Sequence, residues 1–153
     1  MYISELKLDH FRNYDSLDLA FSPGTNLFYG ENAQGKTNIL EAVYFCGTTR
    51  SHRTSKDSEM IRFGAQEAHL RMEMKKTNVD YRIDIHLKEG KAKGIAVNQV
   101  PVRKAQDVIG LGHFVFFRKH FFHTKAQQYR PQKSLFFFCR LVLCIDLWFQ
   151  DLH

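Results

Sequence analysis

The 153-residue sequence has few cysteines, and they follow no disulfide or redox pattern. Its three cysteines, Cys46, Cys139 and Cys144, are odd in number and form no C-x-x-C pair. This argues against a disulfide framework and for a reducing compartment. The segment from Met1 to Glu5 also lacks the basic start and apolar core of a signal peptide. We therefore expect a cytoplasmic protein.

A hydrophobic run long enough to cross a bilayer is also missing. The segment 135–149 is almost continuously apolar, but its 15 residues fall short of a bilayer span and include Arg140 and Asp146. A spanning helix needs roughly 20 apolar residues, and charges inside it make insertion costly. A membrane anchor is therefore disfavoured, and we expect no membrane partner.

The overall composition is that of a globular domain. Hydrophobic residues make up 44% of the chain and charged residues 25%, and the length suits one domain with its own core. The formal net charge is +6, but residues 1–117 account for only +2 of it and residues 118–153 for +4. The basic excess therefore says little about DNA binding.

One stretch matches the phosphate-binding pattern G-x-x-x-x-G-K-[ST] at every fixed position. This Walker A loop consists of Gly30, Glu31, Asn32, Ala33, Gln34, Gly35, Lys36 and Thr37. Glycines let backbone N–H groups turn inward and cradle phosphate oxygens at a helix N-terminus, where the dipole favours negative charge. Lys36 would reach the β- and γ-phosphates, and the Thr37 hydroxyl would bind Mg²⁺. We therefore predict nucleotide binding.

The flanks of the loop are those that such a motif requires. Residues 25–29 follow the turn signal Ser22-Pro23-Gly24 and predict a short buried strand. Apolar residues then recur at helical spacing from 39 to Cys46, and Gly47 is expected to end this helix. The polar and basic residues 48–54 predict a loop close in sequence to the nucleotide.

Alternating apolar and polar residues predict an antiparallel sheet with one solvated face. The expected strands cover residues 4–11, 17–21, 70–75, 79–87 and 95–100, and a compact apolar strand covers 113–117 after a short helix ending at Val108-Ile109. The methionines fall on the buried phase of a strand and are expected in the core. Asp80, Asp84 and the histidines are expected on the solvated face or at strand margins.

Residues 118–153 change in character, since they contain no Gly and no Glu but six of the 14 Phe. The segment 141–146 has the shape of a Walker B strand ending in Asp146, but Leu147 stands where an ABC-type site has a catalytic Glu. The spacing of His120, His123, Cys139 and Cys144 fits the familiar zinc patterns poorly. Both interpretations are therefore disfavoured.

Over residues 1 to about 117, the chain resembles the N-terminal part of the RecF family of bacterial DNA replication and repair proteins. The segments that carry the resemblance are 11–14 (Phe-Arg-Asn-Tyr), 30–42 around the Walker A loop, 51–54 (Ser-His-Arg-Thr), 97–104 and 115–117. The resemblance implies an α/β fold, namely the N-terminal half of a P-loop NTPase of the ABC-ATPase head type, with an antiparallel β-meander and a relationship to SMC proteins.

The resemblance also implies a function. Members of the RecF family bind ATP and Mg²⁺, form ATP-dependent homodimers, bind single-stranded and gapped DNA, and act with RecO and RecR in RecA loading and the SOS response. By motif, Gly30 to Thr37 hold the phosphates and magnesium, while Arg12 and Asn13 lie where the family places nucleotide contacts. Ser51, His52 and Arg53 form a loop that the family associates with the nucleotide and its neighbourhood.

The departures from the family pattern limit these expectations. The ABC signature, the Walker B Asp-Glu pair and the switch His are not recognisable, and the sequence after Phe117 leaves the family pattern. We expect residues 1–117 to form a partial head and residues 118–153 an irregular tail from a frameshift or other non-native end. Nucleotide binding without hydrolysis is expected, and no catalytic residue is assigned. The alternatives are a small P-loop kinase, a non-enzymatic DNA-binding module and a fragment without function.

Overall fold

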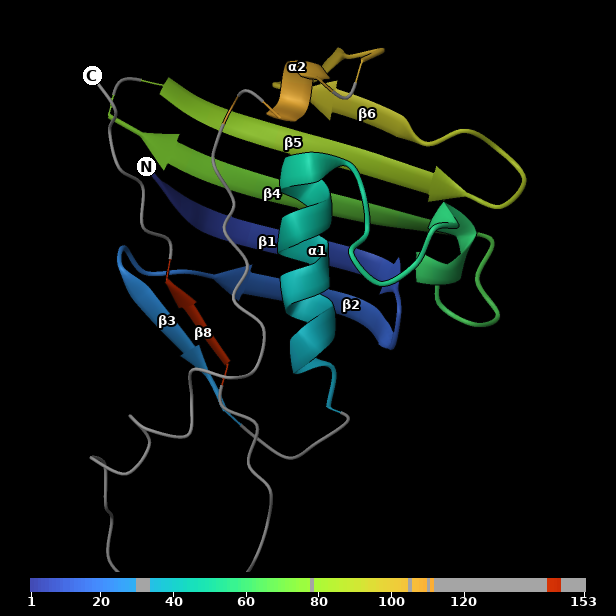
Figure 1. Cartoon of the computed structure of the whole chain (residues 1–153), viewed down its shortest axis with the longest axis horizontal. Coiled ribbons are helices and arrows are strands. Elements are labelled where there is room, and N and C mark those ends of the chain that lie inside the picture. The colour runs from blue at the N-terminus through green and yellow to red at the C-terminus, as the bar shows by residue number, and fades with distance from the viewer. Residues whose placement is uncertain (30–33, 78, 105, 110, 112–142, 147–153) are drawn as a thin grey trace, which may run out of the picture.

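An antiparallel sheet of six strands forms the largest part of the fold (Figure 1). The computed structural model describes residues 1–29, 34–77, 79–104, 106–109, 111 and 143–146. The strands run in the order β2-β1-β4-β5-β6-β7, and each is antiparallel to its neighbours. Their bounds are β1 Tyr2–Phe11, β2 Tyr14–Ala20, β4 Glu67–Lys76, β5 Val79–Lys88, β6 Gly94–Val97 and β7 Val100–Pro101. The predicted antiparallel meander is confirmed.

The longest helix, α1 (Lys36–Thr48), lies across one face of this sheet (Figure 1). Two shorter helices are η1 (Asp57–Met60) and α2 (Gln106–Ile109), and a separate pair of strands consists of β3 (Thr25–Phe28) and β8 (Leu143–Asp146). Within the described ranges, none of the helices has the length and apolar character that crossing a bilayer requires.

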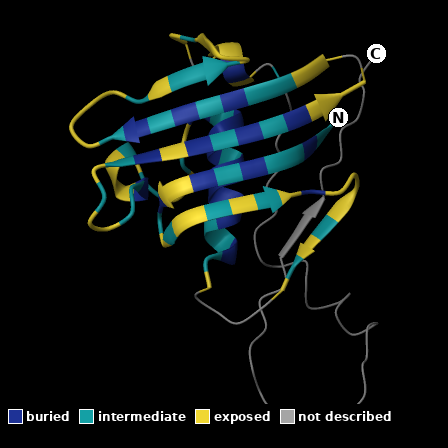
Figure 2. Cartoon of the chain, turned by 180° about the vertical axis from the view of Figure 1, so that it is seen from behind, coloured by how far each residue is buried: buried dark blue, intermediate teal, exposed yellow. Residues whose placement is uncertain are grey.

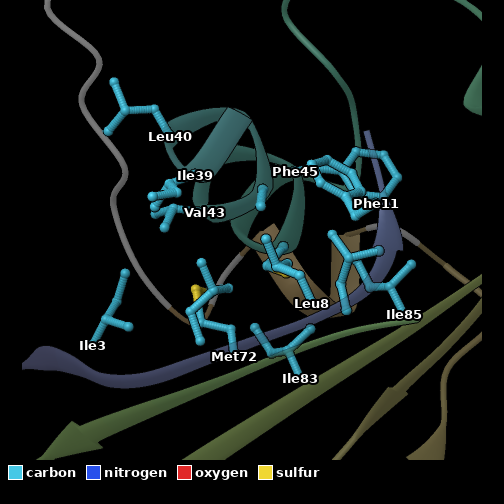
Figure 3. Packing of buried hydrophobic residues seen from close by; sticks show 14 of the residues in the cluster. Ile3, Leu8, Phe11, Ile39, Leu40, Val43, Phe45, Met72, Ile83 and Ile85 are labelled. Atoms are coloured by element: carbon cyan, nitrogen blue, oxygen red, sulfur yellow. The ribbon is translucent and has the colours of Figure 1, made fainter. Parts of the chain in front are cut away.

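The core lies between α1 and the sheet (Figure 3). Because alternate strand residues point to the same side, Leu8 of β1 and Met72 of β4 both turn toward α1 and are fully buried. Ile39 and Phe45 of α1 meet them from above. The expectation that methionines would be core residues is confirmed by Met72 and Met74, since neither is exposed.

The opposite face of the sheet is the solvated one (Figure 2). Its strands alternate buried residues, which point toward α1, with exposed or half-buried polar residues, as in β4 and β5. The expected solvated face is therefore confirmed. Asp84 is half-buried there and accepts hydrogen bonds from Arg71 and Arg82 at 2.7 Å each.

Two expected boundaries were wrong. The helix does not end at Gly47, because Gly47 is buried within it and Thr49 caps it with φ 57, donating its N–H to Phe45 O at 2.7 Å. The strand expected over 95–100 is a tight hairpin, because Asn98 and Gln99 have φ 49 and 68 and turn the chain between β6 and β7. Positive φ at both central positions is typical of a type I′ turn.

The strand before the Walker A loop is less buried than expected, since Leu27 is 53% exposed. It pairs with β8 so that Thr25 lies opposite Asp146 and Phe28 opposite Leu143. Asp146 is therefore at the end of β3 remote from the Walker A loop, which does not support the disfavoured Walker B interpretation. The expected strand 113–117, the zinc candidates His120, His123 and Cys139, and the tail except β8 lie outside the described residues.

Candidate functional site

The end of the Walker A loop forms the N-terminus of α1. Gly35 precedes the helix with φ 90 and ψ 0, a left-handed conformation that glycine adopts without steric cost. Its carbonyl accepts the N–H of Asn38 at 2.7 Å, which begins the helix. Lys36 and Thr37 therefore lie in the first turn, where the helix dipole favours an anion. Gly30 to Ala33 lie outside the described residues.

The turn between β1 and β2 packs directly against this glycine. A Cβ atom added to Gly35 would lie 2.6 Å from Tyr14 Oη and 2.7 Å from Asn13 Nδ2, so any other residue here would require these side chains to shift. Tyr14 Oη also donates a hydrogen bond to Gln34 O at 3.4 Å, and burial raises the pKa of Tyr14. The β1–β2 turn therefore packs against the described end of the Walker A loop, at Gln34 and Gly35.

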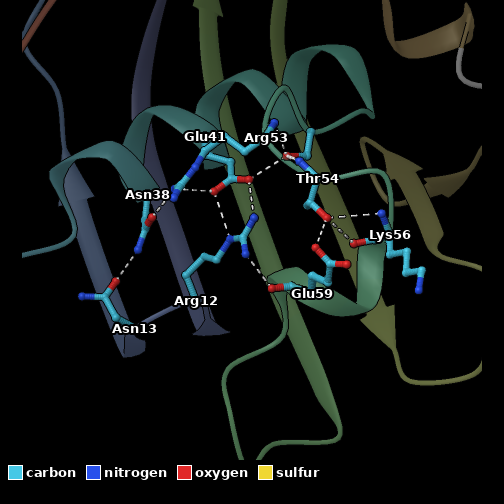
Figure 4. Close-up of polar contacts among 9 residues, drawn as sticks. Arg12, Asn13, Asn38, Glu41, Arg53, Thr54, Lys56 and Glu59 are labelled. Atoms are coloured by element: carbon cyan, nitrogen blue, oxygen red, sulfur yellow. Dashed lines mark hydrogen bonds and ion pairs between the residues drawn. The ribbon is translucent and has the colours of Figure 1, made fainter. Parts of the chain in front are cut away.

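A fully buried carboxylate, Glu41, connects three segments of the site (Figure 4). Arg12 donates from Nη2 to Oε1 at 2.6 Å and from Nε to Oε2 at 3.0 Å. Arg53 Nη1 donates to Oε2 at 3.1 Å, and Ser51 Oγ donates to Oε1 at 2.6 Å. We call Glu41, Arg12, Arg53 and Ser51 the Glu41 cluster. It joins α1 to the β1–β2 turn and to the loop after α1.

The Glu41 cluster contains one buried negative charge, on Glu41, and two positive charges, on Arg12 and Arg53. Its net charge is therefore positive. Burial alone would raise the pKa of Glu41, but hydrogen bonds from Arg12 and Ser51 and the charges of both arginines hold it below its usual value. One carboxylate therefore faces two guanidinium groups. Lys36 adds a further positive charge in the first turn of α1, so the local charge suits a phosphate.

Asn38 extends the Glu41 cluster toward the tip of the β1–β2 turn (Figure 4). Its Oδ1 accepts a hydrogen bond from Arg53 Nη1 at 2.7 Å, and its Nδ2 donates to Asn13 Oδ1 at 2.7 Å. A line of polar contacts therefore runs from Arg53 through Asn38 to Asn13, and Asn38 lies two residues after the Walker A lysine.

The segment that contains η1 holds the β1–β2 turn in place. Arg12 has φ 54, an unusual conformation for a residue with a side chain. Its N–H donates to Met60 O at 2.8 Å and its Nη1 to Glu59 O at 2.7 Å. Arg62 N–H donates to His10 O at 2.7 Å. These bonds compensate the cost of the left-handed backbone and fix the direction of the Arg12 side chain.

The structure brings together most of the residues predicted to surround the nucleotide. Arg12, Ser51 and Arg53 share Glu41, and Asn13 joins them through Asn38. His52 is exposed, and its ring packs edge-to-face on Tyr44 with centroids 5.3 Å apart. Whether these residues contact a nucleotide stays a prediction.

Sequence reasoning missed Glu41 and Asn38 as members of the site. A signal for Glu41 was present, because it lies four residues before Phe45 and therefore on the same side of the helix as a core phenylalanine. A carboxylate on a buried helix face requires a cationic partner, and such partners stand at Arg12 and in the loop after α1. Asn38 had no comparable signal.

Comparisons with known proteins give the relatives of this chain. It matches the AAA domain family over residues 5–137. It is 54% identical over 117 residues to the DNA replication and repair protein RecF of Agathobacter rectalis, and 50% identical over 117 residues to that of Lachnoclostridium phytofermentans. Each alignment covers 76% of this chain and 32% of the relative. The chain thus spans about a third of the length of these relatives.

Solved structures agree with the sequence comparison. The fold superposes on the recombination mediator protein RecF-ATP of the RecFOR pathway with a TM-score of 0.72 and 34% identity, covering 76% of this chain and 32% of that one. An SMC ATPase gives a TM-score of 0.64 at 21% identity, covering 72% and 76%, which shows the shared fold. The predicted fold class and the resemblance to the N-terminal part of RecF are confirmed.

Proposed function

The chain belongs to the AAA domain family, and from this premise we propose that it binds ATP with Mg²⁺ at its Walker A loop. The observation that carries the proposal is the arrangement around α1. Its N-terminus presents Lys36 and Thr37 directly after a glycine with a left-handed backbone conformation, and the Glu41 cluster holds Arg12 and Arg53 nearby. The likeness to a RecF solved with ATP supports the same ligand.

Each part of the proposed site has a separate task. Backbone N–H groups at the start of α1 and the helix dipole bind phosphate oxygens, and Lys36 neutralises their charge. Thr37 supplies a hydroxyl for Mg²⁺, which prefers oxygen ligands. Arg12, Asn13 and the Ser51–Arg53 loop border the nucleotide. Glu41 is a positioning residue, because it holds both arginines without being exposed itself.

A thermal-shift measurement tests ATP binding. At an ATP concentration about 100 times its Kd, Mg-ATP stabilises the folded chain by about 2.7 kcal/mol. For a chain of this length we expect the melting temperature to rise by roughly 5 °C or more. Lys36→Ala should abolish the rise, whereas the control Lys76→Ala, at the exposed end of β4, should keep it. An equal shift in Lys36→Ala would contradict binding at this loop.

We further propose that the chain acts in bacterial DNA replication and repair in the cytoplasm, as a RecF-like protein that binds single-stranded and gapped DNA. The 54% identity to a RecF supports this role. RecR and RecO are the proposed partners in RecA loading and the SOS response, and ATP the proposed trigger of homodimerisation. The meander that follows α1 differs from the βαβ alternation of small P-loop kinases, so we do not propose phosphoryl transfer to a small acceptor.

Fluorescence anisotropy with a labelled gapped duplex tests the DNA role. We expect Mg-ATP to tighten binding in the unmodified chain but not in Lys36→Ala, and added salt to weaken binding in both. Sedimentation velocity with and without Mg-ATP tests dimerisation in the same samples. Tight, salt-dependent binding that ignores ATP would favour a non-enzymatic DNA-binding module. Limited proteolysis tests the proposed unit of residues 1–117.

A further inference from the structure

Three metal-ligating side chains meet on the solvated face of the sheet, on the side away from α1. Glu67 and His69 belong to β4, and His86 belongs to β5. In the register of the two strands His69 lies directly opposite His86. Their rings stack with centroids 4.3 Å apart and an angle of 6° between planes. Glu67 precedes His69 by two residues and so lies on the same face of β4.

The ligand atoms of these residues already lie close together. His86 Nε2 is 3.3 Å from Glu67 Oε2, and His69 Nε2 is 4.0 Å from Glu67 Oε1. One ligand atom from each of the three residues lies within 4.8 Å of the others. Nitrogen and oxygen ligands about 2.0–2.2 Å from a tetrahedral zinc ion are roughly 3.4 Å from one another. Side-chain rotations that tilt the two stacked rings toward a common point would bring all three ligand atoms into one coordination shell.

The backbone that carries these side chains is fixed. β4 and β5 pair without interruption from Glu67 opposite Lys88 to Lys76 opposite Val79. The side chains themselves are about half exposed, so an ion can enter from solvent and water can complete its coordination. His69 and His86 also border a depression of about 350 Å³ on this face. The site is therefore preorganised in its backbone and accessible in its side chains.

The choice of ligands indicates the class of metal. Imidazole nitrogen suits Zn²⁺, Cu²⁺ and Ni²⁺, whereas Mg²⁺ prefers a shell of oxygen atoms. Two imidazoles and one carboxylate are also a ligand set that zinc sites with an open position use. Among the described residues, Lys88 competes with a metal ion for Glu67, because its Nζ donates a hydrogen bond to Glu67 Oε2 at 3.1 Å.

We propose that Glu67, His69 and His86 form a binding site for a first-row divalent transition ion, with Zn²⁺ as the probe. The site is separate from the start of α1, which carries Lys36 and Thr37, since the sheet lies between α1 and the solvated face (Figures 1 and 2). Because the ligands come from two paired strands, the bound ion ties β4 to β5 and stabilises the folded sheet.

A zinc titration of the full chain against a chromophoric chelator tests the proposal. We expect His69→Gln and His86→Gln each to weaken the binding of one Zn²⁺ at least tenfold. The control His10→Asn removes another exposed histidine, and asparagine tolerates its positive φ. This control should leave the affinity unchanged. Equal affinity in all three variants would assign the zinc to other groups and overturn the proposal.

Two further measurements do not depend on the histidine variants. Lys88→Ala removes the competing cation, so it should tighten zinc binding several-fold. In the unmodified chain, one equivalent of Zn²⁺ should shift the ring proton signals of His69 and His86 in NMR spectra. Unchanged ring signals at saturating Zn²⁺, or weaker binding in Lys88→Ala, would contradict the site.

Discussion

Arg12 donates hydrogen bonds to both carboxylate oxygens of Glu41, from Nη2 at 2.6 Å and from Nε at 3.0 Å, and the Glu41 side chain is completely buried. This pair joins the tip of a β-hairpin to the helix that carries the Walker A lysine. Because Arg53 and Ser51 bind the same carboxylate, one buried charge determines how three segments meet. The pair therefore links the stability of the fold to the shape of the proposed nucleotide site.

Removal of the Glu41 carboxylate should destabilise the chain strongly. Glu41→Ala leaves Arg12 and Arg53 without their counter-charge, and breaking a buried ion pair costs about 3–5 kcal/mol. Glu41→Gln should cost less, because its amide oxygen can still accept one hydrogen bond. Urea unfolding measures both. The control Asp18→Ala breaks the exposed ion pair with Lys7 and should change stability by less than about 1 kcal/mol.

The Glu41 cluster should also make stability depend on pH. The folded-state pKa of Glu41 lies below its ordinary value of 4.5, so the unfolded chain takes up a proton that the folded chain does not. The stabilisation is complete above the ordinary pKa and is lost as pH falls through the folded pKa. Urea unfolding at pH 7 and at pH 4 should therefore show a smaller gap between the unmodified chain and Glu41→Gln at pH 4. A gap that does not change would contradict an ionised Glu41.

ATP hydrolysis that depends on Lys36 should be absent from the 153-residue chain. ABC-type hydrolysis requires a base that orients the attacking water and charge stabilisation of the transferred phosphoryl group. We do not expect Asp146 to provide the Walker B function, because it pairs with Thr25 at the end of β3 remote from the Walker A loop. Release of phosphate from Mg-ATP measures the rate. Turnover that Lys36→Ala abolishes would contradict this prediction.

The sequence predicted the sheet and the Walker A helix because period-two alternation and a glycine-rich motif are local signals. The boundaries at Gly47 and at Asn98-Gln99 were wrong for a related reason. Packing of α1 against the sheet allows the helix to continue through Gly47. Pairing of β6 with β7 places Asn98 and Gln99 in a turn with positive φ. Tertiary contacts thus overrode the local preferences.

The site was predictable only in part for the same reason. The motif located Lys36 and Thr37, and the family resemblance located Arg12 and Arg53. Neither revealed that Glu41 joins them, because a hydrogen bond between residues 29 positions apart has no local pattern. The cross-strand pair of His69 and His86 was equally hidden, since it depends on the register of β4 and β5.

Gly35→Ala should damage the proposed site more than its backbone conformation alone explains. Gly35 and Gly64 have nearly the same φ, 90 and 88, so alanine at either position should incur the same cost of about 1–2 kcal/mol. At Gly35 the new Cβ would lie 2.6 Å from Tyr14 Oη, whereas a Cβ added at Gly64 would meet no atom within 4 Å other than those of its chain neighbours. Urea unfolding should show a larger loss for Gly35→Ala, and the Mg-ATP thermal shift should disappear in that variant alone. Equal losses of unfolding free energy in both variants would mean that Tyr14 and Asn13 move aside at little cost when a side chain is added at Gly35. The contact between Gly35 and Tyr14 would then not define the site.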